Sequence, residues 1–322
     1  MMTRWITSLA VAAFAALVAT AALAQYPVRP IRLLVPNPPG GATDITARIV
    51  GQKLAEALGH PVVVENRAGS NGNIASEVAA KAAPDGYTLL FSADSQIVIN
   101  PHLYSKMPLD TLKDLTPVAT LVTTRMVLTV NPSLPVKNFQ EFIEYARRAN
   151  PPLLYASIGN GSQHHLAMEM LKARAGIDLV HVPYKGGGPA TIAILAGEVA
   201  AMFGGNSVSG HIKSGRLRAL ALASSRRAAG TSELPSIGDF YPGYDVTTWL
   251  ALFAPAGIPE PVLARLRDEV GKLLALPEVQ GKLRAAGGLE PFITTPEEFS
   301  SIIRADYAKY GKVVKDSGAK VD

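Results

Sequence analysis

The chain has 322 residues, of which 48% are hydrophobic and 18% charged, a composition typical of a well-packed globular protein and inconsistent with disorder. Its formal net charge of +5 is spread over the whole length without a long Lys/Arg run, which argues against nucleic-acid binding. The sequence contains no Cys, and this excludes disulfides, thiol nucleophiles, thiolate metal sites and a lipoprotein anchor.

The first 24 residues have the features of a secretory signal peptide. Arg4 gives a positive start, residues 6–23 are apolar or small, and residues 22–24 form an A-x-A cleavage site before Gln25. A transmembrane anchor is the alternative, because about 18 apolar residues is the marginal length for a span. The high Ala content and the lack of a following basic cluster favour cleavage. We therefore predict export to the periplasm, with no second apolar run near that length in the mature chain.

The next hundred residues alternate β-branched runs with amphipathic helices. A helix is indicated by apolar residues at three- to five-residue steps, and Gly59 ends it. This order predicts a parallel sheet with helices on both faces. The predicted elements are strands over residues 31–35, 62–64 and 87–91 and helices over 43–58 and 73–82.

A second run of the same kind begins near Met126. It predicts strands over residues 126–130, 153–156, 179–182, 200–203 and 217–223 and helices over 139–148, 162–175 and 189–196. After a strand over residues 250–254 the pattern becomes helix-rich, with helices over 259–274, 277–286 and 296–313.

This order indicates an α/β protein with two lobes, each a mostly parallel sheet flanked by helices. The chain would cross between the lobes near residues 121–126 and again near residues 247–254. Two crossings form a hinge between rigid bodies, as in receptors that close over a ligand. We predict a signal peptide over 1–24, a first lobe over 25–124, a second lobe over 125–248, and a return to the first lobe over 249–322.

The loop over residues 36–44 joins the first strand to the first helix. Two Pro and two Gly let the backbone turn with its N–H groups outward, and Thr43 is placed to cap the helix. Such a loop at the carboxyl end of a parallel strand can bind an anion through backbone donors and a helix N-terminus. A tight βα turn with a good N-cap is the alternative.

The loop over residues 155–165 repeats this arrangement in the second lobe. Ser157 and Ser162 add hydroxyl groups, Ser162 caps the helix, and His164 lies in its first turn. The loop reads G-x-G-S and lacks the fingerprint G-x-G-x-x-G of dinucleotide-binding proteins. A dinucleotide-binding site therefore fits it poorly. Two helix N-termini, one from each lobe, are well suited to hold a carboxylate between them.

A third strand-to-helix turn covers residues 182–190, with three successive Gly before a Pro. Tyr184 and Lys185 can supply a hydroxyl and a charge, although Lys185 also fits a solvated surface lysine. Ser92 and Asp94 end a first-lobe strand and place polar groups at the same edge of the sheet.

The sequence lacks the common catalytic motifs. The sequence has no G-x-S-x-G, S-x-x-K or H-E-x-x-H motif. His164 and His165 are adjacent and would diverge by about 100° on a helix, so they would not share a metal ion. We predict no enzyme activity, no cofactor and no metal site.

The chain resembles the substrate-binding receptors of tripartite tricarboxylate transporters, the Bug family. The similarity covers essentially the whole mature chain, and the combination of motifs is specific. The matching stretches, in order, are residues 39–48, 65–74, 84–90, 100–104, 155–166, 183–186, 217–221, 254–257 and 295–299.

The resemblance implies a Venus-flytrap fold that binds a small carboxylate in the cleft between the lobes. The ligand would be a mono-, di- or tricarboxylate or resemble an acidic amino acid, and a monomeric receptor would deliver it to membrane components of the transporter. A carboxylate held by neutral donors without an Arg clamp is expected, with Arg48 structural. The implied ligand-binding residues are Gly41, Ala42, Thr43, Asp44, Ser92, Asp94, Ser157, Gly159, Asn160, Ser162, one of His164 and His165, Tyr184, Lys185, Gly186, Asn206 and Trp249.

One stretch departs from the family pattern. Residues 235–240 read Pro-Ser-Ile-Gly-Asp-Phe, where such receptors usually have Pro-Thr followed by Glu and Gly. The difference lies near the second crossing between the lobes. It leaves the predicted carboxylate-binding loops unchanged but puts in doubt which substrate can be inferred from the family. Two other functions stay open from the sequence: a ligand sensor for a signalling partner, and an enzyme on the same scaffold.

Overall fold

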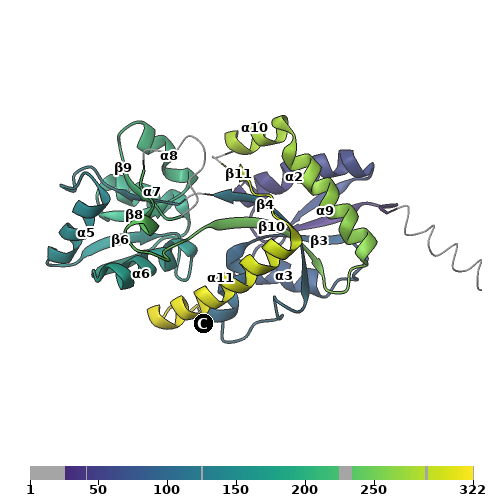
Figure 1. Cartoon of the computed structure of the whole chain (residues 1–322), viewed down its shortest axis with the longest axis horizontal. Helices are drawn as coiled ribbons and strands as arrows, with labels where there is room; N and C mark the ends of the chain where they lie inside the picture. The colour runs from purple at the N-terminus through teal and green to yellow at the C-terminus, as the bar shows by residue number, and fades with distance from the viewer. Residues whose placement is uncertain (1–25, 41, 125, 225–233, 287–288, 322) are drawn as a thin grey trace, which may run out of the picture.

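The computed structural model describes residues 26–40, 42–124, 126–224, 234–286 and 289–321. The predicted signal peptide (1–24) and the predicted ligand residue Gly41 lie outside the described residues. The described chain forms two lobes side by side, each built on one β-sheet with flanking helices (Figure 1). The predicted two-lobe α/β fold is confirmed.

The first lobe contains a six-stranded sheet with the order β11-β4-β10-β3-β1-β2. Its strands are β1 (Ile31–Val35), β2 (Val62–Asn66), β3 (Thr88–Ala93), β4 (Leu115–Thr124), β10 (Thr248–Pro255) and β11 (Glu290–Pro291). β1 pairs in parallel with β2 and β3, whereas β10 is antiparallel to β3 and β4. The sheet is therefore mixed, and a strand from the end of the chain lies in its middle.

Two hydrophobic cores cover the two faces of this sheet. Leu33 and Leu34 of β1 belong to different cores because successive side chains of a strand point to opposite faces. One face carries α2 (Ala42–Leu58), α9 (Glu260–Ala275) and α10 (Pro277–Ala285). The other carries α3 (Asn73–Ala80), a π-helical turn η2 (Ser95–Ile99), α4 (Asn100–Leu103) and α11 (Pro296–Ser317).

The second lobe contains a five-stranded sheet with the order β7-β6-β8-β5-β9. Its strands are β5 (Val127–Val130), β6 (Leu153–Ser157), β7 (Leu179–Pro183), β8 (Ala201–Gly204) and β9 (Arg218–Leu222). The helices are α5 (Phe139–Arg148), α6 (Gln163–Ala175), α7 (Gly187–Ala196) and α8 (Asn206–Lys213). β6 is parallel to β7 and β8, and only β5 runs against its neighbours, so this sheet is also mixed.

Side-chain caps explain where several helices begin. Asn138 Oδ1 accepts the Glu141 N–H at 2.9 Å at the start of α5. Ser162 Oγ accepts the His165 N–H at 3.3 Å at the start of α6. Such caps satisfy backbone donors that have no partner within the helix, and each stabilises a helix by about 1 kcal/mol.

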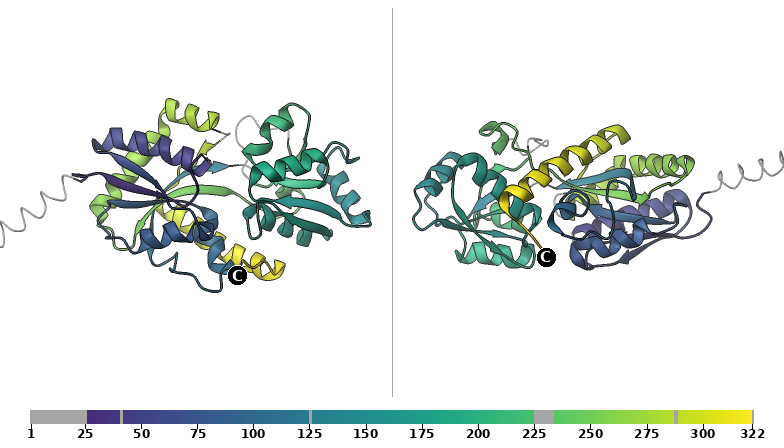
Figure 2. Two further views of the ribbon diagram at one scale, coloured as in Figure 1. Left: turned by 180° about the vertical axis from the view of Figure 1, so that it is seen from behind. Right: turned by 90° about the horizontal axis from the view of Figure 1, so that it is seen from below.

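The lobes are joined by more than the two crossing segments. Helix α11 runs from the first lobe toward the second and packs against α6 (Figure 2). Leu166 of α6 lies in the first-lobe core together with Leu103 of α4 and Tyr310 of α11. The N-terminal half of α6 is therefore held by apolar packing against the other lobe.

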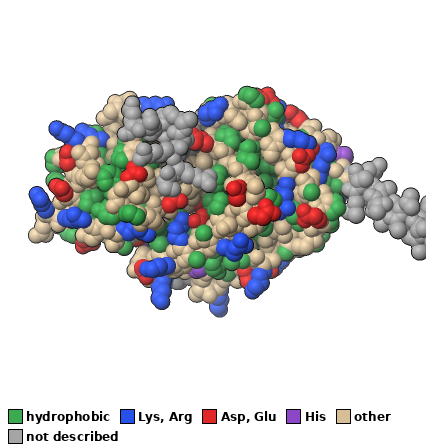
Figure 3. Space-filling model, in the orientation of Figure 1, with side chains coloured by type: hydrophobic (Ala, Val, Ile, Leu, Met, Phe, Trp, Pro, Cys, Tyr) green, Lys and Arg blue, Asp and Glu red, His purple; other side chains and the backbone are tan. Residues whose placement is uncertain are grey.

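Basic and acidic side chains are interspersed over both lobes on the face shown in Figure 3. Within the described ranges, none of the helices combines the length and apolar character that a membrane crossing needs.

Candidate functional site

The predicted site residues lie at the ends of strands and the starts of helices in both lobes, and the β6–α6 region of the second lobe contacts the first lobe. Gln163, the first residue of α6, hydrogen-bonds Asp94 at the end of β3. A Cβ placed on Gly161 would lie 2.5 Å from Leu103 Cδ1 of α4. The β6–α6 loop of the second lobe thus rests directly on the first lobe.

Asp44 fixes the loop between β1 and α2. Its Oδ2 accepts the Gly40 N–H at 2.9 Å and Arg48 Nε at 3.0 Å, and its Oδ1 accepts Asn66 Nδ2 at 2.9 Å. The hydrogen bond from Arg48 is the main cause that lowers the pKa of Asp44 to about 2. Arg48 also donates to Asn66 Oδ1 at 3.2 Å, so its guanidinium is engaged within the loop. Thr43 is half-buried beside this network.

Ser157 is the last residue of β6, where the β6–α6 loop begins, and it is fully buried. Its hydroxyl contacts the backbone of Gly159 at 2.9 and 3.1 Å and His181 Nε2 at 2.7 Å. Gly159 and Gly161 have φ of 138° and 71°, which only Gly adopts without strain. Ser157 therefore shapes the loop from inside, while Ser162 stays half-buried at the helix N-terminus.

The two adjacent histidines of α6 have different surroundings. His165 is buried and accepts the Gly161 N–H on Nδ1 at 3.1 Å. His164 is not engaged in this way: its Nδ1 is buried without a hydrogen-bond partner among the described residues. Burial lowers the pKa of His164 to about 4, so the ring is neutral near pH 7.

Asp94 is the centre of a buried contact between the lobes. Oδ1 accepts the Ser95 N–H at 2.7 Å, and Oδ2 accepts Gln163 Nε2 and, at 3.3 Å, the Trp249 N–H. Only 1% of Asp94 is exposed. Burial, together with the nearby Asp306 carboxylate, raises the pKa of Asp94 to about 8.

Trp249 and Ser92 are also enclosed by the protein. Trp249 is 1% exposed, donates from Nε1 to Asp306 Oδ2 at 2.9 Å, and meets the Phe299 ring edge-to-face with centroids 5.4 Å apart. The Ser92 hydroxyl is buried and donates to Gln96 Oε1 at 3.3 Å. In this conformation neither side chain is open to a solute.

The remaining predicted residues lie at the starts of α7 and α8. Gly186 caps α7 with φ of 105°, and Lys185 beside it is exposed. Burial and the Glu198 carboxylate raise the pKa of Tyr184. Asn206 opens α8, and Ser207 Oγ lies 3.1 Å from Thr191 Oγ1 of α7, so the two helix starts are adjacent. Asn160 is exposed, and its amide donates to Lys320 O at 2.7 Å at the C-terminal end of the chain.

Several residues that organise the site were not predicted. His181 contacts the predicted Ser157 across 24 positions of the chain and Gln163 contacts the predicted Asp94 across 69, while Tyr310 contacts Gln163 across 147. The alternation of Leu179–Pro183 places His181 on the same face of the sheet as Tyr155, and this is the one sequence signal that could have identified it.

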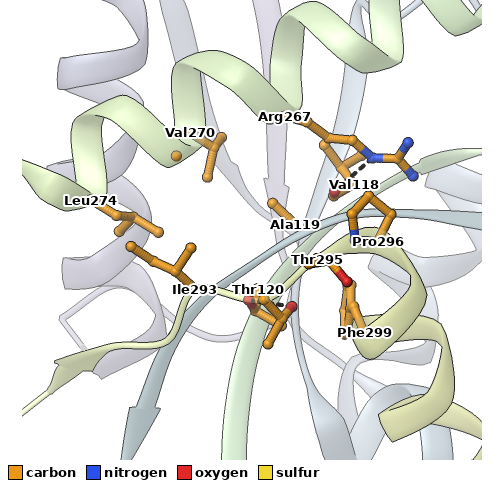
Figure 4. A pocket seen from close by; sticks show the side chains of 12 residues that line it. Val118, Ala119, Thr120, Arg267, Val270, Leu274, Ile293, Thr295, Pro296 and Phe299 are labelled. Atoms are coloured by element: carbon orange, nitrogen blue, oxygen red, sulfur yellow. Dashed lines mark hydrogen bonds between the residues drawn. The ribbon is translucent and has the colours of Figure 1, made fainter.

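Two cavities lie away from these loops. A groove of about 580 Å³ between α6 and α11 is lined by residues such as Met170, Lys172 and Val313, and none of the predicted ligand residues line it. A cavity of about 60 Å³ lies between β4, α9 and the start of α11, and Figure 4 shows Arg267 turned toward the Val118 carbonyl there. The latter holds one or a few water molecules at most. Among the described residues no three potential ligands group around a metal position.

The chain is similar to known proteins in both sequence and structure. A family model described as the tripartite tricarboxylate transporter family receptor matches residues 46–319. The protein BugT of Bordetella pertussis is 37% identical over 299 residues, which cover 92% of this chain and 91% of the relative.

Solved structures resemble the chain over nearly its whole length. The R. palustris protein Rpa4515, solved with adipate, has a TM-score of 0.79 and 32% identity, covering 92% of this chain and 99% of the other. MatC from Rhodopseudomonas palustris, solved with bound malate, has a TM-score of 0.74 and 30% identity, covering 90% of this chain and all (100%) of the other. Other similar structures are described as periplasmic binding or transport proteins.

Proposed function

Because the chain belongs to the tripartite tricarboxylate transporter receptor family, whose members are periplasmic solute-binding proteins and not enzymes, we propose that it captures a small carboxylate between its lobes. In this proposal, residues 25–124 and 249–322 form one rigid body, residues 125–248 form the other, and a cleaved signal peptide directs export. The loaded receptor, a monomer, passes its ligand to the membrane components of the transporter.

The observation that carries the proposal is the similarity, over 92% and 90% of this chain, to two proteins solved with the dicarboxylates adipate and malate. The local geometry supports it. Helices α2, α6, α7 and α8 all begin at loops that follow strands, and the N-terminus of a helix presents backbone N–H groups and a partial positive charge. We expect the carboxylate to lie against these backbone donors.

The predicted residues fall into two proposed roles, which the burial of the described side chains supports; Gly41 and the side chains of Ala42 and Asn206 lie outside that description. We propose that direct contacts come from Gly41, Ala42, Thr43, Gly159, Ser162, His164, Lys185, Gly186 and Asn206. Asp44, Ser92, Asp94, Ser157, His165 and Trp249 are bonded within the protein and would hold the loops in place. Tyr184 and Asn160 would border the site. No Arg clamp is expected, since Arg48 is bound to Asp44 and Asn66.

A thermal-shift panel tests the proposal. The mature protein is expected to gain stability with malate, adipate or another small carboxylate and to show no change with sugars or polyamines. A ligand at a hundred times its Kd stabilises the folded protein by about 2.7 kcal/mol, which raises Tm by several degrees. Stabilisation by sugars or polyamines alone would contradict the proposal. Mass spectrometry of the purified protein would identify a ligand already trapped in it.

Replacing Ser162 by Gly is expected to weaken carboxylate binding about tenfold, because it removes a hydroxyl donor at the start of α6. Gly substitutes for Ser as an N-cap at a cost of a few tenths of a kcal/mol, so the helix itself is preserved. Asn138→Gly is the matched control, since it changes the N-cap of α5 away from these loops. Equal affinities of the two variants, measured by calorimetry, would exclude Ser162 as a ligand contact.

A further inference from the structure

Three aromatic rings form a stack beneath the β6–α6 loop. His165 and His181 lie with ring centroids 3.9 Å apart and planes within 7°. Tyr155 lies 5.0 Å from His181 at 24°, next to it in the parallel pairing of β6 with β7. The stack joins two neighbouring strands to α6, and the loop over residues 157–161 passes over it.

The protons of this cluster can be assigned from the hydroxyl of Ser157. The hydroxyl has one proton and two lone pairs, and it makes three contacts. The Gly159 carbonyl can only accept and so takes the proton, at 2.9 Å, whereas the Gly159 N–H can only donate, at 3.1 Å. With the hydroxyl proton directed to the Gly159 carbonyl, the remaining contact, 2.7 Å from His181 Nε2, is a donation from the ring. This arrangement places the proton of a neutral His181 on Nε2.

His165 makes the complementary contact with its other nitrogen. The Gly161 N–H donates to His165 Nδ1 at 3.1 Å, so Nδ1 must carry no proton. Gly161 is buried, and loss of this acceptor would leave its N–H without a partner away from water. A protonated His165 would instead present an N–H to an N–H. The proton of His165 is then also on Nε2, and the ring is neutral.

We propose that His165 and His181 are positioning residues that hold the loop over residues 157–161 in its binding conformation, each as a neutral ring protonated on Nε2. The role of the loop as a carboxylate grip rests on the proposed function, whereas the tautomers and their hydrogen bonds do not. The two histidines act through Ser157, Gly159 and Gly161 and need not touch the ligand.

The surroundings of the stack favour the neutral rings. Two charged imidazoliums would repel each other at this separation. Burial lowers the pKa of His181, to about 4, and also that of His165. The charged side chains that face the pair are Glu169 and Lys172 of α6, which neutralise each other at 2.9 Å, and Tyr155 donates its hydroxyl to Glu169 Oε1 at 2.7 Å.

Variants that copy one nitrogen of the ring test the role in binding. His165→Asn keeps an acceptor near the position of Nδ1, and His165→Leu does not. We expect His165→Leu to weaken binding of malate or adipate about tenfold, and His165→Asn to restore it to within about threefold of the wild type. His181→Gln, which keeps a donor near Nε2, is expected to bind more tightly than His181→Leu. If the polar variant at either position loses as much ligand affinity as the Leu variant, the positioning role is overturned.

A measurement without ligand tests the tautomers directly. Nitrogen-15 NMR of the histidine rings at pH 7 is expected to show His165 and His181 neutral with the proton on Nε2, and the Gly159 and Gly161 amides are expected to shift when His165 is changed to Leu. A proton on Nδ1 of either ring, or a charged ring, would overturn the assignment. If no carboxylate binds the wild type, the proposed function fails, and the NMR result still decides this inference.

Discussion

Gly161→Ala is expected to destabilise the protein by about 2–5 kcal/mol and to weaken the proposed carboxylate binding at least tenfold. The φ of 71° costs about 1–2 kcal/mol for a residue with a Cβ. The new Cβ would also lie 2.5 Å from Leu103 Cδ1, in a buried contact where overpacking costs about 1–3 kcal/mol. Because Leu103 belongs to the first lobe, the clash pushes the β6–α6 loop away from it. Tm and calorimetric Kd measure the two effects.

Gly176→Ala is the matched control for this change. Gly176 ends the same helix with φ of 61°, and nothing lies within 4 Å of its Cβ position. The Gly176→Ala variant should lose only the stability that a residue with a Cβ loses at positive φ, about 1–2 kcal/mol, and should keep its ligand affinity. Truncating Leu103 to Ala in the Gly161→Ala background should relieve the clash, so that the two changes together destabilise less than their sum. If Gly161→Ala is as stable as Gly176→Ala, the close contact between residue 161 and Leu103 would be disproved.

Asp94→Ala is expected to destabilise the protein by about 3–5 kcal/mol, because three N–H groups lose their buried acceptor. These belong to Ser95, Gln163 and Trp249, so the change also breaks a direct link between the lobes. A fall in Tm on the order of 5–10 °C would follow. Asp110→Ala is the control, since Asp110 also accepts a backbone N–H, at 3.1 Å from Leu112, but on the surface. Similar losses in both variants would contradict the central role of Asp94.

The raised pKa of Asp94 predicts the direction of a pH effect on stability. The native carboxyl keeps its proton up to about pH 8, whereas the unfolded one releases it above about pH 4. Within this window the native state binds more protons, so the contribution of Asp94 to stability falls as the pH rises from about 4 to about 8. Asp94→Asn has no such proton, and its Tm should decrease less than that of the wild type over the same range. A parallel decrease in both proteins would rule out this titration.

Most elements of the fold could be predicted from the sequence because their signals are local. The helix Phe139–Arg148 and the strand Ile31–Val35 have the predicted bounds. Strand β4 (Leu115–Thr124) was missed and its end assigned to a crossing. It contains Pro117, opposite Phe253 at a register shift, and its partner β10 is more than a hundred residues away, so no local pattern reveals it. The turn η2 was missed because its buried apolar run resembles a strand.

The candidate site could be predicted only as a set of loops. Gly and capping residues mark the loops in the sequence, since positive φ and unpaired helix donors demand them. Which side chains face inward depends on distant partners. Ser157 resembles a free hydroxyl until His181 is placed beside it, and Asp94 resembles an exposed strand end until α6 of the other lobe covers it.

The central position of β10 in the first sheet has a consequence for how the protein is made. A chain that is synthesised from its N-terminus delivers β3 and β4 long before residues 248–255, which pair with both. The strands of the second lobe follow one another between residues 127 and 222, so its sheet can close earlier. Until the last quarter of the chain arrives, two hydrophobic strand edges of the first lobe stay open to aggregation. The C-terminal segment thus completes biogenesis as well as the fold.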